Sequence, residues 1–259
     1  MVDISVVLPA YNEARSIAAS LRSLAAFLDA ATSSRGPWSS WEVVLADDGS
    51  SDGTAEVARS ALPGDARVRV LEPSGHLGKG AAVRRGVLEA SGSLILVTDV
   101  DLSYGLADLT AAVAALAGGA DVVTGDRRHP RSRMDLALSA LGHVVRRQAI
   151  SYGFNLAVRT LFGLACRDTQ CGLKGYRREA AARLMTRLRT NGFLADVEVF
   201  IIAERLGLKV ATIPVHLTYL SGNSTVHVVK QAPRVLADAL RIKAAQLKRR
   251  YDGDGAVGR

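Results

Sequence analysis

The feature that most restricts the fold of this chain is a regular alternation of short apolar runs with helix-like segments. Strand-length apolar runs occur at 4–8, 41–46, 67–71, 94–98 and 121–124. Between them, apolar side chains recur at helical spacing over 13–30, 78–90 and 106–116. Because strand–helix–strand units cross over in the right-handed sense, this pattern predicts an α/β fold with a Rossmann-like, largely parallel sheet flanked by helices.

Acidic side chains directly follow two of the predicted strands. Asp47 and Asp48 come after the second run, and Asp99 and Asp101 come after the fourth. Ligands of open α/β sheets bind outside the carboxyl ends of the strands. The sequence therefore predicts a binding site at this edge of the sheet.

The pair Asp99 and Asp101 has the spacing of two carboxylates that can turn toward one ion where the chain leaves a strand. Oxygen ligands favour Mg²⁺ or Mn²⁺, and such an ion bridges substrate phosphates and neutralises a leaving diphosphate. The alternative is a strand-to-loop turn with a helix-capping aspartate. The very apolar run before Asp99 favours the metal interpretation, because two charges at a buried sheet end are costly without a purpose.

Two further segments have the composition of a nucleotide site. Asp47 and Asp48 can accept hydrogen bonds from a nucleobase or a ribose, although a plain turn with a helix cap is the alternative. In the segment 76–80, glycines flank Lys79, and a helix beginning there would attract phosphate. The P-loop pattern is absent, so Lys79 is predicted only as a point-charge partner of a diphosphate.

The pattern changes after about residue 130. We predict an amphipathic helix over 134–162, helices at 178–188 and 196–206, a strand at 209–213 and a basic helix over 233–251. Residues 252–259 are predicted to be a disordered polar tail. The chain is then one domain over 1–251, with the change of pattern dividing it into about 1–125 and about 126–251.

The formal net charge of +8 indicates an anionic partner: nucleic acid, a membrane surface or phosphate-bearing substrates. Nucleic acid is disfavoured by the 5% aromatic content and by the acidic strand ends.

The last helix has leucines on one face among many basic residues. It is either a solvated basic helix or one attracted to anionic lipid headgroups. Arginines cluster after the fifth strand and again further on, either as a basic surface or as a grip on a phosphate-bearing acceptor: Arg127, Arg128, Arg131, Arg133, Arg146 and Arg147.

Cysteines and targeting segments give expectations about location. Cys166 and Cys171 form neither a disulfide scaffold nor a zinc-ligand pattern, which indicates a reducing compartment. We see no signal peptide and no apolar run of the roughly 18 to 20 residues that a spanning helix needs. We therefore expect a cytoplasmic protein that contacts the membrane surface peripherally, and the oligomeric state is left open.

Taken together, several segments resemble the family 2 glycosyltransferases with the GT-A fold. The opening segment 7–13, the segment 47–54 and the Asp-x-Asp segment 99–103 match the order of that family's motifs. Three later segments are more discriminating and resemble its dolichyl-phosphate glucosyltransferase branch and polyprenyl-phosphate relatives: 167–174, 196–198 and 221–226. The resemblance extends over about residues 4–245.

The resemblance implies a nucleotide-sugar half over about 1–125 and an acceptor half over about 126–251. It also implies roles for individual residues. Those expected to bind the nucleotide-sugar are Pro9, Tyr11, Glu13, Asp47 or Asp48, Lys79, Asp99 and Gln170. Those expected to hold Mg²⁺ or Mn²⁺ are Asp101 with Asp99 and Ser103. Those expected to face the acceptor phosphate are Arg127, Arg146 and Arg147. The implied catalytic set is Asp99, Asp101, Asp196, Glu198 and Arg127.

The implied reaction is inverting transfer of a hexose from a nucleotide-sugar to a polyprenyl or dolichyl phosphate, with glucose from UDP-glucose expected and mannose from GDP-mannose as the alternative. A second alternative is a soluble acceptor, for which Asp196 or Glu198 would serve as base. A nucleotidyltransferase would also use Mg²⁺ and aspartates, but it would usually show an N-terminal glycine-rich segment, which 9–13 does not supply.

Overall fold

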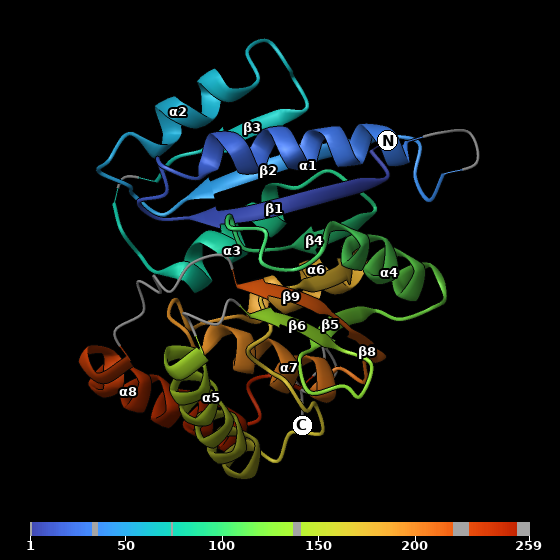
Figure 1. The fold of residues 1–259 in the computed structure, drawn as a ribbon. Helices are drawn as coiled ribbons and strands as arrows, with labels where there is room; N and C mark the ends of the chain where they lie inside the picture. The colour runs from blue at the N-terminus through green and yellow to red at the C-terminus, as the bar shows by residue number, and fades with distance from the viewer. Residues whose placement is uncertain (1, 33–35, 74, 137–140, 220–227, 253–259) are drawn as a thin grey trace.

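The computed structural model describes residues 2–32, 36–73, 75–136, 141–219 and 228–252. A seven-stranded sheet forms its centre, in the order β3-β2-β1-β4-β7-β5-β8 (Figure 1). The strands are β1 (Ile4–Ala10), β2 (Trp41–Asp47), β3 (Val68–Leu71), β4 (Leu94–Val97), β5 (Val122–Asp126), β7 (Lys174–Arg177) and β8 (Val210–Pro214). The predicted α/β architecture is therefore confirmed.

Strand β7 is the exception in an otherwise parallel sheet. It runs antiparallel to β4 on one side and to β5 on the other. A Cβ atom on Gly175 would lie 2.7 Å from Val123 Cγ1 and 2.8 Å from Leu96 Cδ2, so this position has no room for a side chain. The sequence did not indicate this strand, because its four residues, KGYR, lack an apolar run.

The predicted helix over 134–162 is wrong at its start. Residues Arg133–Leu136 form strand β6, which pairs in parallel with β9 (His216–Tyr219) in a separate two-stranded sheet. Met134 packs against the core beside the buried Leu217, its partner in the register. Helix α5 then covers Leu141–Phe162. The pairing with β9, some 80 residues later, overrides the local helical pattern.

Helices cover both faces of the main sheet (Figure 1). Helix α1 buries Ile17, Leu21, Leu24 and Leu28, whose spacing of three to four residues forms one face, and each such side chain contributes about 1.5–3 kcal/mol when fully buried. Helices α1, α2 and α4 share a core on one face, and α3, α6 and α7 pack on the other. Their bounds are α1 (Ile17–Ala31), α2 (Thr54–Ala61), α3 (Lys79–Glu89), α4 (Leu106–Ala117), α6 (Arg178–Arg187) and α7 (Ala195–Arg205).

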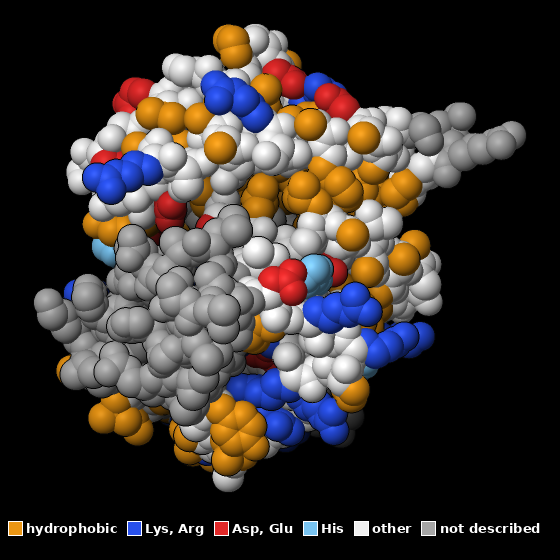
Figure 2. All heavy atoms as spheres, in the orientation of Figure 1, with side chains coloured by type: hydrophobic (Ala, Val, Ile, Leu, Met, Phe, Trp, Pro, Cys, Tyr) orange, Lys and Arg blue, Asp and Glu red, His pale blue; other side chains and the backbone are white. Residues whose placement is uncertain are grey.

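The last helix, α8 (Val228–Leu247), begins before the predicted 233 and ends before 251. It contacts the end of α5, where Lys243 Nζ donates to the Leu161 carbonyl at 2.9 Å. Apolar and basic side chains lie next to each other at the lower end of the molecule in Figure 2, the end that carries these two helices in Figure 1. Within the described ranges, helices are too short or too polar to cross a bilayer.

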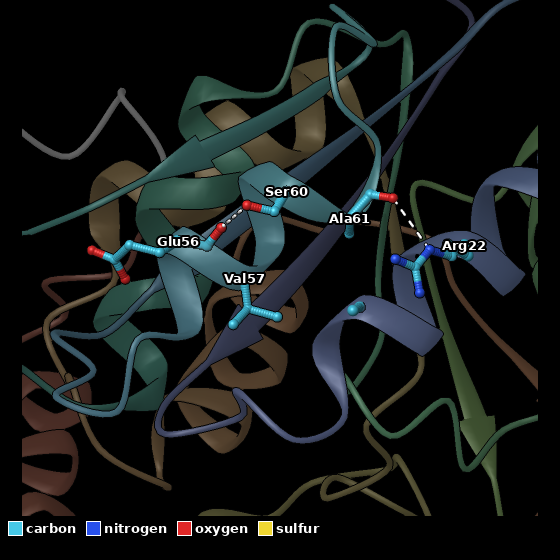
Figure 3. Close-up of a pocket in the computed structure, with 6 residues that line it drawn as sticks. Arg22, Glu56, Val57, Ser60 and Ala61 are labelled. Atoms are coloured by element: carbon cyan, nitrogen blue, oxygen red, sulfur yellow. Dashed lines mark hydrogen bonds between the residues drawn. The ribbon is translucent and has the colours of Figure 1, made fainter.

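A groove lies between α1 and α2 on the outer surface (Figure 3). Arg22 Nε donates across it to the Ala61 carbonyl at 3.3 Å. Its lining contains none of the predicted site residues: it consists of Ala18, Arg22, Glu56, Val57, Ser60 and Ala61. The predicted aspartates Asp47, Asp48 and Asp99 lie instead at or just after the carboxyl ends of β2 and β4.

Candidate functional site

The carboxyl ends of β1, β2 and β4 meet at one edge of the sheet. Ala10 at the end of β1 is in register with Asp47 at the end of β2, and the Asp48 amide donates to the Ala10 carbonyl at 2.8 Å. On the other side of β1, Val7 is paired with the last residue of β4. The structure thus brings together the two acidic segments, as parallel pairing requires.

Asp47 and Asp48 are almost fully buried, at 3% and 4% exposure, and both carboxylates are bound by neighbouring N–H groups. Asp47 accepts from Ser50 N at 3.0 Å and so closes the turn after β2. Asp48 accepts from the backbone N–H groups of Leu77 and Gly78, each at 2.9 Å. Asp48 therefore fixes the chain that leads into α3.

An aromatic pair lies beside these aspartates. The Tyr11 ring, which is 46% exposed, has its centroid 4.2 Å from that of His76, and His76 Nδ1 lies 2.9 Å from an Asp48 oxygen. Pro9 is part of β1, and Glu13 accepts from the Ser16 hydroxyl at 2.6 Å. His76 was not among the predicted site residues, although its position three residues before Lys79 was visible in the sequence.

Lys79, the first residue of α3, forms an ion pair with Asp99. Burial lowers the pKa of the Lys79 ammonium, but the nearby charge of Asp99, with Asp196 and Asp101, outweighs it and raises the pKa. Burial likewise raises the pKa of Asp99, and the Lys79 charge, with Lys174 and Arg127, lowers it overall. Both groups are therefore charged at neutral pH, in the centre of a cluster of alternating charge.

Asp101 is exposed, and its Oδ1 accepts from Ser103 N at 3.1 Å. The chain turns at Leu102, whose φ is 47°, and the Ser103 carbonyl accepts from Thr218 N in β9 at 2.8 Å. Strand β9 thus holds the loop that carries Asp101.

The donor set at this loop fits a divalent ion that shares its coordination with substrate. In the part of the chain that the structure describes, no three His, Cys, Asp or Glu side chains gather around a common point for an ion. Mg²⁺ sites of phosphate-transferring proteins need only one or two carboxylates, because substrate phosphates complete the coordination. The exposed Asp101 carboxylate, close to the charge of Lys79 and Asp99, matches that arrangement.

A buried lysine in β7 joins the cluster. Lys174 is 2% exposed, and its Nζ lies 3.1 Å from Asp196 Oδ1 and 2.5 Å from the Cys171 carbonyl oxygen. Asp196 is in the first turn of α7. Sequence reasoning assigned no role to Lys174. Because strand β7 was not predicted, nothing in the sequence marked this lysine as buried and in need of a partner.

Asp168 binds one edge of the Arg127 guanidinium through both of its carboxylate oxygens. Arg127 Nε and Nη2 donate to the two Asp168 oxygens at 2.7 and 2.8 Å, and the Asp168 side chain is completely buried. Burial would lower the pKa of Arg127, but Asp168 raises it. The predicted phosphate contact is thus an arginine held in one orientation by a partner that sequence reasoning missed.

Glycine allows the segment 167–173 to approach Asp99 closely. A Cβ atom on Gly172 would collide with the Asp99 carboxylate, and the Gly172 N–H donates to the Tyr104 hydroxyl oxygen at 2.8 Å.

In the same segment, Gln170 Nε2 is buried and has no hydrogen-bond acceptor among the described residues. An unsatisfied buried amide is costly, so this group is available to a ligand.

Glu198, expected in the catalytic set, is completely buried. Its carboxylate accepts from Arg189 N at 3.1 Å, Thr190 N at 2.8 Å and the Tyr251 hydroxyl at 2.6 Å. Protein donors thus occupy both oxygens, and this carboxylate holds its neighbours in place. The catalytic role that the resemblance implies for it stays a prediction. Arg146 and Arg147 lie in α5, and their side chains are outside the part that the structure describes.

Curated proteins of known activity align with most of this chain. The dolichyl-phosphate β-glucosyltransferase of Dictyostelium discoideum is 30% identical over 244 residues, which cover 90% of this chain and 73% of that protein. The human enzyme of the same name is 32% identical over 235 residues, covering 86% of this chain and 69% of the relative.

Solved structures share the fold. Glucosyl-3-phosphoglycerate synthase from Mycobacterium tuberculosis superimposes with a TM-score of 0.59 at 24% identity, over 99% of this chain and 84% of that one. The same enzyme has been solved with Mn²⁺ and UDP-glucose, at 22% identity and the same TM-score. The likeness confirms the predicted GT-A fold. The family model described as glycosyl transferase family 2 matches residues 5–185, and the chain therefore belongs to that family.

Proposed function

We propose that this protein transfers glucose from UDP-glucose to a polyprenyl or dolichyl phosphate with inversion at the anomeric carbon. The observation that carries the proposal is the charge cluster at the strand ends, where Lys79, Asp99 and an open Asp101 lie beside Lys174 and Arg127. Such a site can bring two anionic substrates together. The names of relatives that align over most of their length support glucose and the lipid phosphate.

The donor would lie across the ends of β1, β2 and β4. Tyr11, with Pro9, Glu13 and one of Asp47 or Asp48, would face the nucleoside. Lys79 would bind the diphosphate at the start of α3, where the positive end of the helix dipole also favours negative charge. Asp99 and the unpartnered Gln170 amide would bind sugar hydroxyls.

Asp101, with Ser103 beside it, would hold Mg²⁺ or Mn²⁺ together with the donor phosphates. When bound, the ion supplies positive charge that stabilises the leaving diphosphate. The Lys79 ammonium places a further positive charge beside the leaving diphosphate. It remains protonated, because Asp99 raises its pKa. The protein thereby stabilises the departure of UDP without having to protonate it.

The acceptor would be a phosphate monoester, which is already an anionic nucleophile and needs no strong general base. Arg127, fixed by Asp168, would bind this phosphate together with Arg146 and Arg147. An acceptor oxygen attacks the anomeric carbon as the bond to the diphosphate breaks, so the configuration inverts. The division into a donor half over about 1–125 and an acceptor half over about 126–251 stays a prediction.

A donor screen tests the proposal. The protein would be incubated with Mg²⁺ or Mn²⁺, a polyprenyl phosphate in detergent, and either UDP-glucose or GDP-mannose, with nucleoside diphosphate release and glycolipid formation as readouts. We expect glycolipid from UDP-glucose only. Preference for GDP-mannose would support mannosyl transfer instead, and equal turnover with a soluble sugar acceptor and no lipid would contradict the lipid acceptor.

We also propose peripheral contact with a membrane through α5 and α8. Leu236, Leu240 and Leu247 are 63%, 65% and 75% exposed and share one face of α8. On α5, Tyr152 and Leu156 are also more than half exposed. Basic side chains flank the leucines, as an anionic lipid surface requires, and they include Arg234, Arg241, Lys248, Arg249 and Arg250.

The double variant Leu236→Ser/Leu240→Ser is expected to bind anionic lipid vesicles at least tenfold more weakly, because each leucine loses part of the roughly 1.5–3 kcal/mol of apolar transfer. Vesicle co-sedimentation measures the loss, and added salt should weaken binding of the wild type. Leu88→Ser, which changes an exposed leucine on α3, is the control and should bind normally. Unchanged binding of the double variant would contradict the proposed surface.

A further inference from the structure

A buried hydroxyl–carboxylate pair joins the end of the described chain to α7. The Tyr251 hydroxyl, on a residue that is 1% exposed, donates to Glu198 at 2.6 Å, and Glu198 is completely buried. Burial and the adjacent carboxylate raise the pKa of Tyr251, so the phenol remains a donor at all physiological pH values. The other Glu198 oxygen accepts from the N–H groups of Arg189 and Thr190. The pair therefore holds the segment 189–192, between α6 and α7, by its backbone.

The held segment packs directly on the first turn of α3. The Ala81 N–H donates to the Asn191 carbonyl at 3.3 Å. A Cβ atom on Gly78 would lie 2.6 Å from the Asn191 oxygen, and one on Gly80 would lie 2.9 Å from the same atom. Both glycines thus allow backbone-to-backbone contact that side chains would prevent. Lys79 is the residue between them, and its ammonium pairs with Asp99 in the site.

We propose that Glu198 and Tyr251 are positioning residues for the donor site, acting through the segment 189–192 on the turn that carries Lys79. The route consists of short contacts between buried or backbone groups, so a shift of the segment moves the start of α3 with it. A Lys79 ammonium displaced by about 1 Å loses much of its interaction with a diphosphate. The inference rests on the proposed function for the role of Lys79 toward the donor.

The first test is Tyr251→Phe, which leaves the ring in place and removes the donor to Glu198. We expect the Kd for UDP and the KM for the donor to rise about tenfold, which is 1.4 kcal/mol and within the range for a hydrogen bond to a charged group. The KM for the acceptor should not change. A purely structural role would instead lower the thermal stability and the active fraction while leaving both KM values intact.

Ser5→Ala is the matched control. The Ser5 hydroxyl also donates at 2.6 Å to a buried carboxylate, that of Glu42, and Ser5 is 0% exposed. This pair lies at the amino ends of β1 and β2, at the opposite end of these strands from the site. Ser5→Ala is expected to lose stability with no change in the Kd for UDP. An equal rise of the Kd in both variants would overturn the inference.

Substitutions of Glu198 separate positioning from chemistry. Glu198→Gln keeps an oxygen that can accept from Arg189 and Thr190 and an amide that can bond to the Tyr251 hydroxyl, so its donor KM should stay within about twofold of the wild type. Glu198→Ala should raise the donor KM at least as much as Tyr251→Phe. Loss of turnover in Glu198→Gln would show that the carboxylate itself is required and would overturn the positioning role.

Calorimetric titration with UDP and Mn²⁺, without acceptor, keeps the two hypotheses apart and measures only folded protein. If the wild type does not bind UDP, the proposed function fails. If the wild type binds UDP and the Tyr251→Phe and Glu198→Ala variants bind it equally well, the proposed function stands and the positioning inference is wrong.

Discussion

Replacement of Asp101 by alanine is expected to lower turnover about 10³-fold, which corresponds to roughly 4 kcal/mol of transition-state stabilisation. The carboxylate is exposed and lies near Lys79, and in the proposed mechanism it holds the ion that stabilises the departing UDP. Without it, Lys79 alone would offset the charge of the leaving group. The dependence of turnover on Mg²⁺ or Mn²⁺ should disappear together with most of the rate.

The fold of the Asp101→Ala variant should survive, because an exposed side chain with one backbone hydrogen bond contributes little to stability. The decisive measurement is a metal titration of turnover and of UDP binding: both should rise with metal in the wild type and stay flat in the variant. Asp65→Ala serves as control, since Asp65 also accepts from the N–H two residues later, at 3.0 Å, but lies just before β3. Wild-type turnover in Asp101→Ala would remove Asp101 from the site.

The sequence predicted the parts of the fold that depend on local pattern. Each strand that the structure places in the parallel core has an apolar run, from Ile4–Ala10 to Val210–Pro214. Helices α1, α3, α4, α6 and α7 begin within a few residues of the predicted positions, whereas α5 begins later. The aspartates that follow two of the strands also predicted the position of the site. Parallel pairing sends all carboxyl ends to one edge, so Asp47 and Asp99 must approach each other whatever the loops do.

The sequence alone does not show which distant segments of the chain contact each other. Strand β7 is polar. It fits between β4 and β5 because Gly175 has no side chain at a position where a Cβ atom would collide with Val123 and Leu96. Arg127 and Asp168 are 41 residues apart, and the sequence does not show which of many carboxylates meets a given arginine. Glu198 shows the same limit. The resemblance implies a catalytic role, which stays a prediction, and only the structure shows that this carboxylate is buried and accepts from backbone N–H groups.

Asp168→Asn is expected to lower the free energy of unfolding by about 3 kcal/mol or more. The substitution keeps the size of the side chain and removes its charge, which leaves the Arg127 guanidinium, 16% exposed, without a counter-ion. Breaking a buried pair by removing one partner typically costs about 3–5 kcal/mol. Turnover should also fall, because the two bonds from Asp168 fix the orientation in which Arg127 would meet the acceptor phosphate.

The pH dependence of this loss has a definite sign. Burial raises the pKa of Asp168, but the bonds and charge of Arg127 outweigh it and hold the pKa below its usual range. A carboxylate with a depressed pKa in the folded state contributes stability above its unfolded pKa of about 3.9, and this contribution is lost as the pH falls through the folded value. The stability difference between wild type and Asp168→Asn should therefore be constant between about pH 5 and 7 and shrink below about pH 4.

Urea unfolding at several pH values measures this difference, and an exposed pair of the same geometry provides the control. Arg67 binds Asp65 with Nε and Nη2 at 2.9 and 2.7 Å, close to the values for Arg127 and Asp168, but its side chain is 45% exposed. Solvent screens such a pair, so Asp65→Asn should cost no more than about 1 kcal/mol. The contrast isolates burial as the cause. Equal losses in the two variants, or a gap for Asp168→Asn that persists below the folded pKa, would show that the Arg127–Asp168 pair does not stabilise the site through its charge.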